Sequence, residues 1–281
     1  MMNLNRALMH VYLIILCASG CSPAFIYVHQ PNIAESYFSN KAQKAKRSAE
    51  KNPQNPNTLI AACSLMTMYH YGFTMEAADR IIEDNYALGK ETFETAHLGF
   101  ISAYDFGEAA LRIKYPEFSE WINGVPSESL DFKTEDVPVL YWTGAALGGA
   151  ISSSRGDPKW VIRLPIVGKL FESALKINPA WNRGSLYSAM ISYTMSRSDL
   201  DIEANEIAAD YLQKANIASG GFHGGAELSF AETVLVKTQN KEAFMEKVQA
   251  VLNNQSKEDV ADIIVAERAQ WLLSRTGDLF Y

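Results

Sequence analysis

The sequence predicts an all-α protein, a degenerate tetratricopeptide-like solenoid or bundle of about 10–11 antiparallel helices. Strand signals are scarce, because Asn123-Gly124 is the one hairpin-type dipeptide and no alternating apolar and polar residues flank it. Helix start and stop signals recur, and the short loops between them favour antiparallel neighbours. The expected helices lie near residues 32–51, 57–71, 74–88, 91–114, 135–153, 165–177, 181–196, 203–218, 225–238, 240–253 and 257–275.

Capping residues predict several of these boundaries. Thr74 is suited to cap the helix near 74–88, and Asp157-Pro158 combines an N-cap with a proline at the first helical position. Ser256 and Asp259 have the spacing of a capping box, with Asp in the usual place of Glu, and predict the start of the last helix. Asn178-Pro179 and Gly220-Gly221 are stop signals for two other helices.

The segment from residue 125 to residue 138 interrupts this succession of helices. It is polar and contains Pro126 and Pro138. We predict a long surface loop rather than a domain boundary, because helices of the same kind are expected on both sides. Residues 21–281 are therefore predicted to form a single helical domain.

One segment carries a repeat signature. The pattern Phe171-x-x-Ala174-Leu175-x-x-x-Pro179 matches the second helix of a tetratricopeptide unit, in which Phe fills the gap between units, Ala allows close approach and Pro ends the helix. The stretch from Ala208 through Leu212 to Ala215 repeats the pattern at a spacing longer than the usual 34 residues. A weaker echo begins at Phe106. Generic antiparallel helix packing is the alternative explanation.

Composition excludes several classes of protein. The chain has 281 residues, of which 48% are hydrophobic and 20% charged, as is typical of a globular protein with a sizeable core. The formal net charge of −7, without basic clusters, argues against binding to nucleic acid. Three cysteines, two of them within the first 21 residues, do not make a disulfide scaffold.

The N-terminus resembles a bacterial lipoprotein signal. The apolar run Val11–Cys17 is too short to span a bilayer, which needs roughly 20 residues, and has the geometry of a signal peptide. It ends in Ala18-Ser19-Gly20-Cys21, which is similar to a lipobox. This likeness implies that residues 1–20 are removed and that the Cys21 thiol is acylated. In the lipoprotein sorting pattern, Ser22 suggests the outer membrane, with the protein facing the periplasm. A plain secretory signal is the alternative.

Motifs for catalysis are missing from the sequence. There is no phosphate-binding loop, no dinucleotide fingerprint, no HExxH and no Gly-x-Ser-x-Gly, and the five histidines lack ligand spacing. The glycine-rich stretch from Gly220 to Gly225 lacks a preceding strand and is predicted to be a turn. Cys63, in an apolar stretch, is expected to be a buried and inert thiol. We therefore predict a protein that is not an enzyme and uses neither a cofactor nor a metal.

From about residue 137 onward, a series of motifs carries a family resemblance. They are Leu140-Tyr141-Trp142, Asp157-Pro158, Leu164-Pro165, the stretch from Leu170 to Pro179, Gly184, Ala231-Glu232, Phe244, Glu267-Arg268-Ala269 and Leu279-Phe280. On these residues the chain resembles the T-component family associated with TRAP transporters, the TatT-like periplasmic lipoproteins. Two departures are Leu147, where the family usually has a second Trp, and Ile263-Ile264, where it has Asn-Leu; they suggest a shifted pocket lining.

The resemblance implies a non-catalytic role in transport. Family members have an all-α, tetratricopeptide-like body with an internal cavity or pore. They are thought to assist a TRAP transporter by working with the soluble substrate-binding (P) component on apolar ligands. A homo-oligomer is left open. The alternative is an outer-membrane scaffold whose helical groove binds a protein in another envelope assembly, and a weaker third option is an envelope enzyme.

Two helix starts supply the candidate binding residues. Gly144 and Gly148 leave one helix face nearly bare, which permits either close helix approach or a cavity. Aromatic rings with one arginine suit an apolar molecule with an acidic head. The alternative is that the rings are ordinary core and the arginine lies on the surface. The candidates are Tyr141, Trp142, Gly144 and Gly148 on one helix and Trp181, Arg183 and Tyr187 on the other.

Overall fold

The computed structural model describes residues 31–124, 130–200, 203–254, 256 and 259–281, and every regular element within these ranges is a helix. The all-α prediction is therefore confirmed for this part of the chain. The predicted signal peptide and Cys21 lie outside the described residues. Among the described helices, none is long and apolar enough to cross a membrane.

The first elements form a bundle of long helices. α3 (Pro31–Lys51) packs against α4 (Pro56–Tyr69), and α4 packs against α6 (Tyr86–Lys114). Between α4 and α6, the π-helical segment η1 (His70–Met75) continues into α5 (Glu76–Ile81). α8 (Val137–Ser153) then packs against both α4 and α6, and the largest hydrophobic core lies among these helices.

Shorter helices form the second half. α10 (Leu164–Ile177) packs against α8 and α11, and α11 packs against α12 and α13. A second hydrophobic core joins α13, η4, α14 and α15. The bounds are η3 (Trp181–Gly184), α11 (Ser185–Ser196), α12 (Glu203–Ala218), α13 (Gly224–Phe230), η4 (Ala231–Leu235), α14 (Lys241–Asn253) and α15 (Val260–Ser274), with the small helices α7 (Phe118–Ile122), η2 (Thr134–Asp136), α9 (Pro158–Val161) and α16 (Thr276–Leu279) between or after them.

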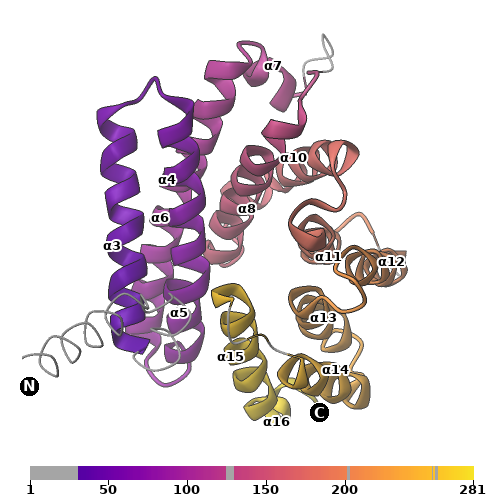
Figure 1. The fold of residues 1–281 in the computed structure, drawn as a ribbon. Helices are drawn as coiled ribbons and strands as arrows, with labels where there is room; N and C mark the ends of the chain where they lie inside the picture. Colours follow the sequence, from indigo (N-terminus) through magenta and orange to yellow (C-terminus); the bar gives the residue numbers. More distant parts are fainter. Residues whose placement is uncertain (1–30, 125–129, 201–202, 255, 257–258) are drawn as a thin grey trace, which may run out of the picture.

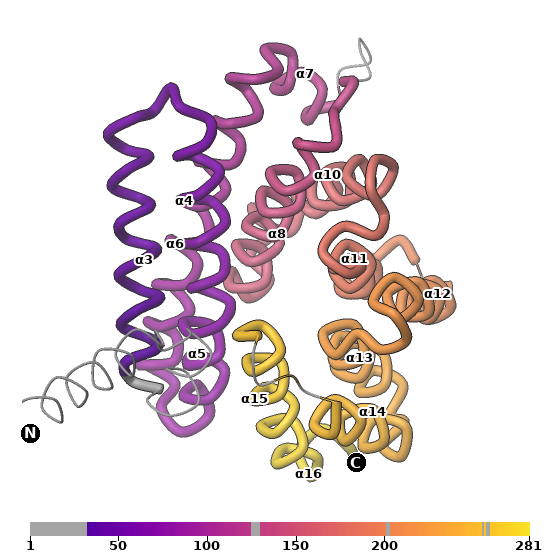
Figure 2. The backbone as a smooth tube through the Cα atoms, in the orientation of Figure 1, coloured from indigo at the N-terminus to yellow at the C-terminus, as the bar shows by residue number. Residues whose placement is uncertain are grey.

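Together the helices follow a ring. From the bundle the chain passes through α8 and α10 to α11–α14, and α15 returns toward the bundle (Figures 1 and 2). Ile263 of α15 shares a small apolar cluster with Ala34 of α3. The Ile264 Cδ1 atom lies 2.8 Å from the position of a β-carbon on Gly72. The last long helix therefore contacts the first elements of the chain, and the glycine in η1 permits that approach.

Two predicted helix starts are wrong. Thr74 does not cap a helix, because η1 joins α4 to α5 without a break, and its side chain is buried with Oγ1 3.2 Å from Nδ1 of His70. The next helix begins at Tyr86 rather than near residue 91, since the Asn85 carbonyl side chain accepts from the N–H of Leu88 at 3.1 Å. The physical reason for the first error is that the π-helical segment η1 continues the helix through Thr74, although a threonine at such a position usually indicates a helix start.

Other boundaries follow the sequence more closely. Asp157 accepts from the N–H of Lys159 at 2.9 Å and caps α9, and α10 ends before Asn178-Pro179. The last long helix is capped by Asp259 rather than by Ser256, since the Asp259 carboxylate accepts from the N–H of Ala261 at 2.9 Å. The short helices α7 and α16 were not predicted, and of α9 only the start at Asp157-Pro158 was, because four or five residues are too few to show a period.

The proposed repeat positions are buried. Phe171 and Ala174 lie in the main core, and Ala208, Leu212 and Ala215 lie in a third cluster between α11 and α12. This agrees with their expected packing role. The tetratricopeptide-like character of the ring stays a prediction.

Candidate functional site

A cavity of about 950 Å³ lies at the centre of the ring. Its lining comes from η1, α5, α6, α8, α10, α11, α13, η4 and α15, so that both halves of the described chain contribute. The volume falls within the range of roughly 300–1,000 Å³ that is usual for small-molecule sites. Two parts of the lining differ sharply in chemistry.

The apolar wall consists of α8 and α10. Gly148 lies in its middle, where a β-carbon would meet nothing closer than the Tyr71 hydroxyl at 3.7 Å. The spacing of the lining residues places them on one face of each helix. The other residues of the apolar wall are Tyr141, Ala145, Ile151, Leu164, Val167 and Phe171, with Ser152 and Arg155 at the C-terminal end of α8.

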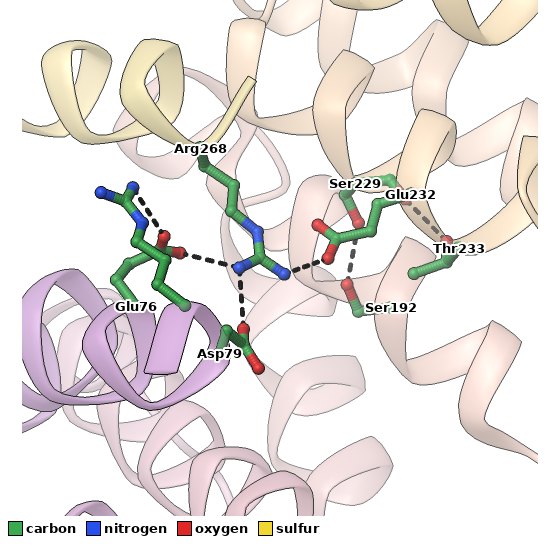
Figure 3. A network of polar contacts seen from close by, with 8 residues as sticks. Glu76, Asp79, Ser192, Ser229, Glu232, Thr233 and Arg268 are labelled. Carbon is green, nitrogen blue, oxygen red and sulfur yellow. Dashed lines mark hydrogen bonds and ion pairs between the residues drawn. The ribbon is translucent and has the colours of Figure 1, made fainter. Parts of the chain in front are cut away.

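The hydroxyl wall consists of α11 and the helix formed by α13 and η4. Four serines of α11 recur at intervals of three or four residues and therefore share one face. The Oγ atoms of Ser192 and Ser229 lie 2.8 Å apart and join the two helices (Figure 3). The hydroxyl-bearing residues of this wall are Ser185, Ser188, Ser192, Ser196, Ser229 and Thr233, and Ala189 and Tyr193 of α11 line the cavity beside them.

A charged cluster closes the ring beside the hydroxyl wall. The guanidinium of Arg268, on α15, lies 2.7 Å from Oδ2 of Asp79 and 3.4 Å from Oε1 of Glu76, both on α5. It also donates to Glu232 of η4 (Figure 3). The Arg268 side chain is only 15% exposed and stacks over Trp271 at 4.5 Å from the ring centroid. One buried cation therefore joins three carboxylates from two distant elements.

Burial and charge oppose each other in this cluster. Burial favours the neutral form of Arg268, but the carboxylates of Glu232, Glu76 and Asp79 outweigh it and raise the pKa of the guanidinium. Burial raises the pKa of the Glu76 carboxyl, although Arg268 and Arg80 act in the opposite direction. The cluster therefore stabilises the charged form of Arg268, whereas the raised pKa of Glu76 shifts that carboxyl toward its protonated form.

Two of the seven candidate binding residues line the cavity, Tyr141 and Gly148. Gly144 instead permits close helix approach, the other role expected for the bare face, because a β-carbon there would lie 2.7 Å from Cε1 of Phe171. Trp142 and Trp181 flank the Tyr141 ring, at centroid distances of 4.9 and 4.8 Å.

The last two candidates lie outside the cavity lining as well. Arg183 is exposed and pairs with Asp262 at 3.4 Å, and the Tyr187 ring packs 6.1 Å from that of Tyr211. For Arg183 the reason is local, because Asn182 and Arg183 take positive φ angles of 46° and 58° and interrupt the helix before α11. Leu147, Ile263 and Ile264, the family departures, are not among the lining residues either.

Sequence reasoning missed the polar part of the site. The helical spacing of the α11 serines was visible, but serine spacing alone does not indicate which way a face points. Arg155 lines the cavity, and its guanidinium lies 4.8 Å from the centroid of the Phe93 ring. Among the ion pairs recorded for the described residues, none involves Arg155. Its positive charge therefore faces a cavity without a carboxylate of its own.

Cys63 matches its prediction as a buried thiol. It is fully buried in the main core, and this burial raises its pKa to about 12, so the reactive thiolate is suppressed at neutral pH. Across the described ranges, no group of three His, Cys, Asp or Glu side chains is placed to hold a metal ion.

Comparison with known proteins gives two findings. A family model described as TRAP transporter T-component matches residues 48–280. A protein of Treponema pallidum (strain Nichols), described as an uncharacterized protein, is 19% identical over 242 residues, which cover 82% of this chain and 74% of the relative. The family match extends well upstream of residue 137, where the resemblance in the sequence begins.

Proposed function

Because the chain belongs to the TRAP transporter T-component family, we propose that it assists a TRAP-type uptake system without catalysing a reaction itself. In this proposal it binds the substrate-binding component and holds an apolar or amphipathic ligand. The observation that carries the proposal is the central cavity of about 950 Å³. Family membership supports an accessory role in TRAP transport, and the ligand and the contact with the substrate-binding component are the parts proposed here.

The cavity suits a ligand with an apolar body and an acidic group. Phe171 and Tyr141 offer rings, and Gly148 leaves space in front of α8. Arg155, rather than Arg183, is the cation that lies on the lining without an acidic partner among the described ion pairs. An acidic head beside Arg155 would place the apolar body along α8 and α10.

A transfer partner must also release its ligand and its neighbour. We therefore expect a small interface with the substrate-binding component and a fast off-rate. In the same proposal, acylation at Cys21 anchors the protein in the outer membrane with its body in the periplasm. An anchored cavity would stay close to the envelope while the soluble component comes and goes.

The experiment combines ligand retention with partner binding. Protein purified from its own cells is examined by native mass spectrometry for a retained small molecule, and a pull-down measures association with the cognate substrate-binding component. Gly148→Phe should fill the cavity and lower retention without loss of helical signal. Gly277→Phe is the matched control, because a β-carbon at Gly277 meets nothing within 4 Å and this exposed residue does not line the cavity.

The outcomes separate the two candidate functions. Retention that is lost in Gly148→Phe and kept in Gly277→Phe supports the cavity as a ligand site. If wild-type protein shows neither a bound molecule nor association with the substrate-binding component, the transport proposal fails and the scaffold alternative takes its place.

A further inference from the structure

The hydroxyl wall has hydrogen-bonding capacity left over for a ligand. In the pair formed by Ser192 and Ser229, one hydroxyl donates to the other, so the accepting hydroxyl keeps its own proton free to donate. Ser196 donates to the carbonyl of Ser192 at 2.8 Å, and Thr233 donates to that of Ser229 at 2.7 Å. Oxygen lone pairs of these side chains stay available as acceptors. The wall therefore offers both donors and acceptors over several turns of helix.

A pure hydrocarbon chain would not match this lining. Each hydroxyl covered by an apolar group loses its water and gains no partner, which is unfavourable. The apolar wall has the opposite requirement, because a strongly polar ligand would leave the rings of Tyr141 and Phe171 against polar groups. The lining serines extend from Ser185 to Ser196, the two ends of α11, so the polar groups of the hydroxyl wall are spread along that helix rather than gathered at one point.

We infer that the cavity takes a facially amphipathic molecule, with a rigid apolar body on one side and hydroxyl or carbonyl groups along the other. The apolar side lies on α8 and α10, and the polar edge lies on the serines of α11 and on Ser229. This inference rests on the proposed function, since it names the class of ligand for the same cavity. It differs from a head-and-tail lipid, whose polar group would occupy one end only.

The test uses two steroid probes that share a skeleton. Cholate carries hydroxyls on one face, whereas 5β-cholanate has the same rings and carboxylate and no hydroxyl, so Arg155 meets the same charge in both. Palmitate serves as a head-and-tail probe. Binding is measured by calorimetry below the micellar concentration of each probe, with wild-type protein, Ser192→Ala/Ser229→Ala and the control Ser64→Ala/Ser173→Ala. The control serines lie on α4 and α10 and outside the cavity lining.

The expected result is a selective loss. Removing both hydroxyls should weaken cholate binding about tenfold, through lost hydrogen bonds, while 5β-cholanate changes less than twofold. The control pair should change neither. The inference is overturned if both steroids weaken together, if neither responds, or if wild-type protein binds palmitate more tightly than cholate.

Gly148→Phe distinguishes this failure from that of the proposed function. If Gly148→Phe abolishes binding of the probes while Ser192→Ala/Ser229→Ala changes the binding of the two steroids equally, the cavity is a ligand site. In that case only the inferred facially amphipathic class of ligand is wrong. If no probe binds wild-type protein, or if Gly148→Phe alters the binding of none, the facial class fails, and native mass spectrometry and the pull-down decide the proposed function separately.

Discussion

Arg268 on α15 and Asp79 on α5 form an ion pair of 2.7 Å across a sequence separation of 189 residues. Glu232 of η4 meets the same guanidinium from the other side, so one side chain ties the first and last parts of the ring together (Figure 3). The cavity is bounded on this side by that cluster. This buried cation therefore adds a polar contact to the apolar contacts of Ile263 and Ile264 that also close the ring.

Replacing this cation should be costly. Arg268→Met keeps much of the packing on Trp271 but leaves Glu76, Asp79 and Glu232 facing one another without it, and we expect a loss of about 3–5 kcal/mol in the free energy of unfolding. Lys214→Met is the control, because its pair with Asp210 on α12 is exposed and should contribute only about 0.3–0.5 kcal/mol. Urea denaturation measures both. Equal effects of the two substitutions would show that the cluster does not hold the ring closed.

His70 should make the protein sensitive to mild acid. Burial, with a smaller contribution from the charge of Lys46, lowers its pKa from 6.5 to about 4. Between these two pH values the His70 imidazole is protonated in the unfolded chain but neutral in the folded chain. The free energy of unfolding therefore falls as the pH drops from about 6.5 to about 4, by about 3 kcal/mol in all. The ring occupies the space that a β-carbon on Gly99 would fill, 1.9 Å from Nε2, which explains its burial.

The check is a comparison across pH. Thermal unfolding of wild-type protein and His70→Gln is measured at pH 7 and at pH 5. The wild type should lose more stability than the variant over this interval, because contributions from His223 and from the carboxylates are common to both. Parallel loss in the two proteins would contradict a neutral, buried His70.

Gly144 and Gly148 should respond in opposite ways to the same substitution. A β-carbon at Gly144 would lie 2.7 Å from the Phe171 ring, so Gly144→Ala should destabilise the fold by roughly 1–3 kcal/mol through overpacking. A β-carbon at Gly148 makes only ordinary contacts, 3.7 Å from the Tyr71 hydroxyl and 4.0 Å from Val167, so Gly148→Ala should stabilise α8 by about 0.5–1 kcal/mol, the usual gain of Ala over Gly in a helix. Melting curves of the two variants give the answer, and two changes of the same sign would rule out the assigned division between packing and cavity.

Cys21→Ser tests the lipid anchor. The substitution should prevent acylation and release the mature protein from the membrane fraction, because stable anchoring needs more than one acyl chain, each buried CH₂ adding about 0.8 kcal/mol. Fractionation of cells and the mass of the mature protein measure the effect. A variant that is processed and acylated as before would refute the lipoprotein interpretation.

The sequence by itself determined the helical class, most boundaries and the family. Stops such as Asn178-Pro179 and caps such as Asp157 act within a few residues, so local physics suffices to place them. The burial of Phe171 and Cys63 also followed from apolar neighbours. Where local rules failed, at Thr74, the helix continues as a π-helical segment and Ile264 of α15 packs close to Gly72 within it.

Only the tertiary structure decided which faces meet at the centre of the ring. The α11 serines, Arg155 in the turn after α8 and Arg268 of α15 come from separate parts of the chain. The periodicity of the serines fixes a common face but not its direction. Gly144 and Gly148 lie one turn apart, yet one packs under Phe171 and the other borders the cavity. The packing of α8 on α10 places Gly144 under Phe171, and the ring closes through pairs such as Arg268 and Asp79, which join segments so distant in the chain that no local pattern encodes the contact.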